Sequence, residues 1–142
     1  TRTAPESFGT SGEDRATLDL IAGQTGSRAR ELGHLVPEDF RLNDDTPTIT
    51  CRASATKDRK RADQPIRVDL AVPRRPWLAC KARGQSVFPP PHSRNVSRMN
   101  GKDMEAAGIA TVDASGDLMD FHGLRHFICI QLVFSGVPAK VA

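Results

Sequence analysis

The chain has 142 residues, of which 38% are hydrophobic and 26% are charged, with a formal net charge of +3. This size and composition predict one soluble globular domain, and they exclude a disordered chain. No apolar run reaches the roughly 18 residues of a membrane-spanning helix, and the N-terminal residues lack the apolar core of a secretory signal, so we expect a cytoplasmic protein without membrane contact.

The first half of the chain predicts two helices followed by a β-hairpin. An apolar face at helical spacing predicts a helix over 13–24, and Gly26 marks its end. A shorter helix is expected over 28–35. Alternating β-branched residues predict a strand over 47–53, and 66–68 is its expected partner. The charged segment between these strands would form a long basic tip.

The second half predicts three further helices of unequal quality. The helical pattern over 69–82 contains Pro73 and Pro76, so we expect a broken or shortened helix. A helix is also predicted over 93–107. The segment 122–135 is apolar almost all round, which predicts a buried helix. The fold class is therefore α+β, mostly helical, with a small antiparallel β-hairpin or sheet.

The cysteines and histidines indicate neither a disulfide framework nor a metal site. Three cysteines at unrelated spacings indicate reduced thiols rather than a disulfide framework. His122 and His126 lie one helical turn apart, but no third metal ligand accompanies them, so we expect neither a metal nor a cofactor.

Basic residues are distributed in a way that favours an anionic partner. They cluster at 57–61 and again at 74–83, and local clusters of this kind bind phosphates. His122 and Arg125 lie three residues apart at a predicted helix N-terminus, so they share a face that suits a bound phosphate. Taken one at a time, these features also fit a solvated charged turn and an exposed arginine beside a helix cap.

Three segments, taken in order, resemble the signature boxes of the tyrosine recombinases, the phage-integrase family. The first is Thr-Gly-Ser-Arg-Ala-Arg-Glu-Leu at residues 25–32. The second is the basic segment 56–66, which ends in a Pro-Ile pair. The third is Asp-Phe-His-Gly-Leu-Arg-His at residues 120–126. The resemblance extends from about residue 14 to residue 142 and implies the catalytic-domain fold of that family.

The resemblance implies a site that transfers DNA strands. Arg28 and Arg125 would hold the reacting phosphate, and Lys57 would protonate the leaving 5′ oxygen. His122 would transfer or position a proton, and Glu31 would support Arg28.

The same resemblance implies further groups and partners. His126 would be a supporting residue, while Arg59, Lys60 and Arg61 would hold the DNA backbone. The expected partners are double-stranded DNA and other recombinase protomers, in the nucleoid of a bacterial cell.

The sequence contains no tyrosine, which is the nucleophile of this family. We therefore expect a loose lead-in over 1–12 and an incomplete integrase-like catalytic domain over 13–142 that cannot cut DNA alone. Two alternatives remain: a non-catalytic DNA-binding or regulatory module derived from a recombinase, and an unrelated α+β domain. The last predicts that Arg28, Lys57, His122 and Arg125 are scattered in the folded chain.

Overall fold

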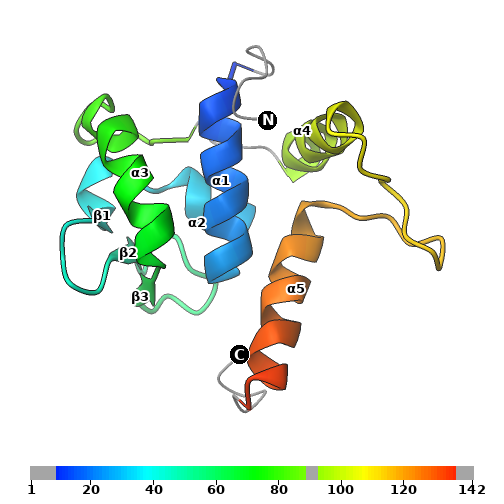
Figure 1. Ribbon diagram of the computed structural model, residues 1–142. Helices are drawn as coiled ribbons and strands as arrows, with labels where there is room; N and C mark the ends of the chain where they lie inside the picture. Colours follow the sequence, from blue (N-terminus) through cyan, green and yellow to red (C-terminus); the bar gives the residue numbers. More distant parts are fainter. Residues whose placement is uncertain (1–8, 89–92, 137–142) are drawn as a thin grey trace.

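Residues 9–88 and 93–136 are described by a computed structural model, which places one helix at the centre of the molecule (Figure 1). This helix, α1 (Gly12–Thr25), begins where the Ser11 hydroxyl accepts a hydrogen bond from the Asp14 N–H and ends at Gly26. The short helix α2 (Ala29–Gly33) and the 3-10 turn η1 (Pro37–Asp39) follow it. The expected helix over 13–24 is confirmed, and the expected lead-in falls largely on residues 1–8, outside the described part.

A three-stranded antiparallel sheet packs to one side of α1. Its order is β1 (Phe40–Arg41), β2 (Thr48–Cys51) and β3 (Ala62–Pro65), with Cys51 opposite Ala62. The prediction that 66–68 pairs with the first strand is wrong. The register starts the partner strand at Ala62, inside the charged segment, and Val68 already begins the next helix.

Helix α3 (Val68–Ala79) is shortened as expected, but it is not broken. Its prolines, Pro73 and Pro76, lie on its exposed face, and so do the residues four positions before them. Water can therefore satisfy the carbonyl groups that each proline leaves without a donor. Trp77 on the opposite face stacks on Phe88, with ring centroids 5.6 Å apart.

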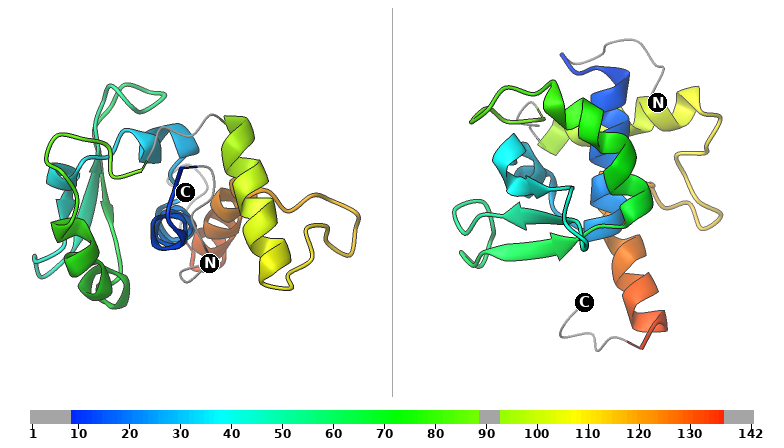
Figure 2. Two further views of the ribbon diagram at one scale, coloured as in Figure 1. Left: turned by 90° about the horizontal axis from the view of Figure 1, so that it is seen from above. Right: turned by 60° about the vertical axis from the view of Figure 1, so that its left-hand side comes forward.

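Helices α4 (Ser93–Ala106) and α5 (Phe121–Phe134) lie on the other side of α1 (Figures 1 and 2). The prediction that the last helix is buried is wrong. Within α5 only Phe121 is buried, and Phe127, Ile130 and Val133 are each about half exposed. One face of α5 packs on α1 and α4, and the rest of its apolar surface has no described neighbour that covers it.

The core therefore lies around α1, α2, the sheet and α3, and α4 closes one end of it. Its members are mostly aliphatic and aromatic side chains from these elements: Leu18, Ile21, Ala22, Leu32, Leu35, Phe40, Leu42, Ile49, Cys51, Ile66, Leu70, Ala71, Trp77, Val87, Phe88, Val96, Met99 and Phe121. The architecture is mostly helical with one small sheet, so the expected α+β class is confirmed. No helix in the described part of the chain is both long enough and apolar enough to cross a bilayer.

A candidate phosphate-binding site

The site begins at the tight turn that joins α1 to α2. Gly26 adopts the left-handed conformation, with φ 63°, and its N–H donates to the Ala22 carbonyl at 2.9 Å. The Thr25 hydroxyl donates to the Ile21 carbonyl at 2.8 Å. This turn delivers Arg28 to the start of α2 with its side chain 42% exposed.

Glu31 holds Arg28 in place from one helical turn further on. One carboxylate oxygen accepts the Arg28 backbone N–H at 2.7 Å, and the other accepts its guanidinium Nη1 at 3.2 Å. The Glu31 side chain is only 10% exposed, whereas the Arg28 side chain is more open to solvent. This charge-assisted contact restricts the arginine side chain.

Helix α5 crosses directly over the turn. The guanidinium of Arg125 donates to the Gly26 carbonyl, 99 residues away in sequence. A Cβ atom on Gly26 would lie 2.7 Å from the Cγ2 atom of Ile128, which is closer than real Cβ contacts. Glycine is therefore required here both for its backbone angle and for the close approach of α5.

Two neighbouring cavities, of about 200 and 210 Å³, are lined by the side chains that the sequence analysis selected. Arg28 and Arg125 line both cavities. Lys57 lines the first, and His122 lines the second. The four residues therefore converge in the folded chain instead of being scattered, which counts against the unrelated-domain alternative.

The N-terminus of α5 positions the histidine pair. The Asp120 carboxylate caps this helix by accepting the Gly123 N–H at 3.1 Å. His122 and His126 contact each other edge to face, with ring centroids 4.8 Å apart. Both side chains are exposed, and no group of three metal-ligating residues occurs among the described residues.

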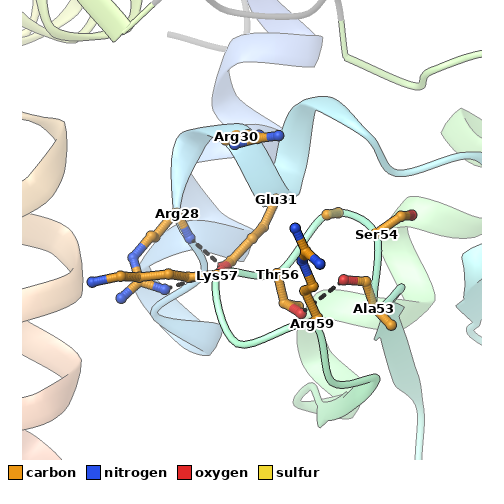
Figure 3. A pocket seen from close by; sticks show the side chains of 9 residues that line it. Arg28, Arg30, Glu31, Ala53, Ser54, Thr56, Lys57 and Arg59 are labelled. Atoms are coloured by element: carbon orange, nitrogen blue, oxygen red, sulfur yellow. Dashed lines mark hydrogen bonds and ion pairs between the residues drawn. The ribbon is translucent and has the colours of Figure 1, made fainter.

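The basic side chains of the segment between β2 and β3 line different cavities. Lys60 lines the first cavity together with Lys57, and the Asp58 carboxylate joins them there. Arg59 lines a larger cavity beside α2 that adjoins the first one and is shown from close by in Figure 3. Arg61 instead pairs with Asp63 at 3.1 Å and lines a pocket with Glu38 and Arg41. Of the three expected backbone-binding residues, the structure thus places only Lys60 beside Lys57 in the first cavity.

Cys51 and Arg30 also line these cavities, although sequence reasoning assigned neither of them to the site. Cys51 faces the first one, with its sulfur 3.9 Å from the Ser27 hydroxyl oxygen. Burial raises the pKa of this thiol, so it is protonated at neutral pH and is a poor nucleophile. Arg30 lines the larger cavity, and its place two residues after Arg28 in a basic string was the available signal.

Comparison with known proteins gives one structural likeness. An integrase from mycobacterium phage Brujita superposes with a TM-score of 0.58 at 23% sequence identity, over 96% of this chain and 42% of the integrase. The chain thus has an integrase-like α+β fold and spans less than half the length of that protein. No family model matches the sequence. No curated protein matches it either.

Proposed function

We propose that this chain binds the phosphodiester backbone of double-stranded DNA and belongs to the machinery of site-specific recombination or integration. The observation that carries this proposal is the convergence of Arg28, Lys57 and Arg125 on one cavity. Guanidinium groups approach from α2 and from α5, and an ammonium group approaches from the hairpin. Such an arrangement suits a phosphate whose nonbridging oxygens gain charge during strand transfer. The fold shared with a phage integrase supports the same function.

Each residue then has a defined task. Arg28 and Arg125 clamp the phosphate, and Lys57 protonates the leaving 5′ oxygen. His122 lines the neighbouring cavity and positions the attacking group or its proton. Because the sequence has no tyrosine, the chain alone forms no 3′-phosphotyrosyl intermediate. Incubation with a suicide DNA substrate should therefore give no covalent complex, and a covalent complex would refute this part.

DNA affinity tests the phosphate clamp. Fluorescence anisotropy with a labelled 20-base-pair duplex should show weaker binding for Arg28→Ala and for Arg125→Ala. The slope of log affinity against log salt should fall by about 1 for each lost phosphate contact. Arg67→Ala is the matched control, because its side chain is 74% exposed and lines none of the three cavities beside α2. Equal loss in the control and the clamp variants would contradict the proposal.

A second candidate is a DNA-binding module without catalytic function, which the missing tyrosine favours. The recombinase site and the binding module can be distinguished with a DNA substrate that carries an aryl leaving group in place of the missing tyrosine. In a nicked duplex, one strand ends in a 3′-p-nitrophenyl phosphodiester beside a free 5′-hydroxyl. The 5′ oxygen attacks phosphorus, its proton passes to the Lys57 amine, and the bond to p-nitrophenolate breaks.

A recombinase site should accelerate release of p-nitrophenolate together with ligation, because stabilisation of the transition state does not require the tyrosine to be in the chain. Lys57→Ala and Arg125→Ala should abolish the acceleration. A binding module should hold the same duplex without any release above background.

A further inference from the structure

A third and larger cavity adjoins the two that hold the proposed reacting phosphate. Its volume is about 660 Å³, and it lies between α2 and the segment that connects β2 to β3 (Figure 3). It shares Arg28 and Lys57 with the first cavity, so the two spaces are contiguous. The lining residues are Arg28, Arg30, Glu31, Ala53, Ser54, Ala55, Thr56, Lys57 and Arg59.

The charges around this cavity favour an anion. Four cationic side chains line it against one carboxylate, Glu31, and that carboxylate is already bonded to Arg28. Neither Arg30 nor Arg59 forms a salt bridge with another described residue. Their charges are therefore available to a ligand, whereas Arg61 is held by Asp63.

The backbone of Arg59 is the unusual feature of this wall. Its φ of 52° makes it the single non-glycine residue with positive φ among the described residues. This conformation is strained for a residue with a side chain, and such strain is concentrated at functional positions. Figure 3 shows the Arg59 guanidinium extending toward α2, on the side of Glu31 away from Arg28. Apart from Lys57, the remaining lining side chains from the connecting segment are small, which leaves room for a ligand beside Arg59.

We propose that this cavity is a second anion subsite, which takes the phosphate next to the reacting one on the same DNA strand. Arg59 and Arg30 are its ligands, one from the hairpin connection and one from α2. Because Arg28 and Lys57 border both spaces, a strand that fills the first cavity continues into the second. The subsite would fix the direction and register of the strand across the site. This inference rests on the proposed DNA-binding function.

The salt dependence of DNA binding provides the first test. With the 20-base-pair duplex, the Arg30→Gln/Arg59→Gln variant should lose about one unit of salt slope for each arginine, and each single variant should weaken binding about tenfold, as expected for one charge-assisted hydrogen bond. Arg67→Gln, outside both basic clusters, is the control with the same change of charge, and it should leave the slope unchanged. Arg59→Gly removes the guanidinium while it keeps a residue that tolerates positive φ, so it separates loss of charge from distortion of the loop.

Short thymidine oligomers test whether two phosphates are held side by side. Dimers, trimers and tetramers offer one, two and three phosphodiesters, and chemical-shift titration measures their affinities. The increase in affinity from dimer to trimer should be large in the unmodified protein and should be lost in Arg30→Gln/Arg59→Gln. A gain of the same size in that variant would overturn the subsite. If Arg28→Ala and Arg125→Ala bind the duplex normally, the proposed function fails instead, so the two failures are distinguishable.

Discussion

Helices α1 and α5 are both 14 residues long, but α1 is largely buried and α5 is largely exposed. Helix α1 is only weakly apolar and buries six residues, two of them polar. Helix α5 is far more apolar and buries one. The difference follows from position, because α1 lies between the sheet with α3 and the pair α4 and α5 (Figure 2), whereas α5 packs on one side only. Burial in this fold is thus decided by tertiary neighbours rather than by local apolarity.

The candidate site lies at the junction of these two regions. Arg28 is positioned by the well-packed region through Glu31 and the end of α1. Arg125 and His122 are supplied by the exposed helix α5, which meets the turn at Gly26. The geometry of the phosphate clamp therefore depends on how firmly α5 is held against α1.

The largest effect is expected at the buried ion pair that joins α1 to α4. The guanidinium of Arg15 contacts Asp103 through two nitrogens, at 2.8 and 3.1 Å, and also donates to the Thr10 carbonyl. Arg15→Met should lower the free energy of unfolding by about 3–5 kcal/mol, because it leaves the Asp103 carboxylate buried without its partner. The measurement is urea denaturation followed by circular dichroism. The Arg15→Met/Asp103→Leu variant should recover much of the loss, and no recovery would show that the pair is not the cause.

A matched pair of isoleucines tests the comparison directly. Ile21 on α1 is 2% exposed, and Ile130 on α5 is 51% exposed. Ile21→Ala should cost about 2–5 kcal/mol of unfolding free energy, through lost burial and a cavity. Ile130→Ala should change it by less than about 0.5 kcal/mol. Equal losses at the two positions would mean that α5 is as deeply packed as α1.

Much of α1 and the turn could be predicted from sequence, because the signals are local. The apolar spacing and Gly26 fixed the end of the helix within a residue or two. The start of β3 was not predictable, since it depends on which residue faces Cys51 across the sheet. The exposure of α5 was missed because an apolar pattern states what a helix can bury and not what lies beside it.

The candidate site shows the same division. The order of three motifs was enough to select Arg28, Lys57, His122 and Arg125, which the structure brings together. The cavity beside Arg30 could not be foreseen, because it depends on the fold of the segment between β2 and β3. Arg59 has a left-handed backbone there, which no local sequence signal required.

The contact between the helices should respond to a single methyl group. Gly26→Ala combines a left-handed backbone, costing about 1–2 kcal/mol, with a contact of 2.7 Å to Ile128. Gly116→Ala is the control, because Gly116 also has positive φ but a Cβ there meets no atom within 4 Å. Thermal unfolding should show a larger decrease in melting temperature for Gly26→Ala than for Gly116→Ala. Gly26→Ala/Ile128→Ala should recover part of the extra loss, and failure to do so would mean that α5 does not rest on the turn.

DNA affinity should follow the same series of variants. Gly26→Ala moves α5 away from the turn and so displaces Arg125 from the cavity that it shares with Arg28. We expect weaker binding to the duplex at temperatures where the variant is still folded. Gly116→Ala should bind as the unmodified protein does. Unchanged binding in Gly26→Ala would separate the position of α5 from the phosphate clamp.

A pH-dependent effect is expected at Asp19 on α1. Burial, and after it the nearby Asp103 carboxylate, raise the pKa of this carboxyl from 3.8 to about 7, with Arg15 opposing both. In the unfolded chain the pKa returns to about 3.9, so the folded protein binds this proton more tightly. The stabilising contribution is complete below about pH 4 and is lost as the pH rises toward 7. Above pH 7 it should not change further.

Asp19→Asn isolates this contribution from those of other carboxyl groups. Hydrogen bonds hold the pKa values of Asp63 and Glu38 below their usual range. Their contribution to the stability of the fold is therefore lost as the pH falls, which is opposite to the effect of Asp19. The useful quantity is therefore the difference in unfolding free energy between Asp19→Asn and the unmodified protein, measured from pH 4 to pH 8. It should grow in favour of the variant up to about pH 7 and then level off, since asparagine carries no charge toward Asp103. A difference that stays constant with pH would mean that Asp19 titrates normally and that the contact between α1 and α4 tolerates a second charge.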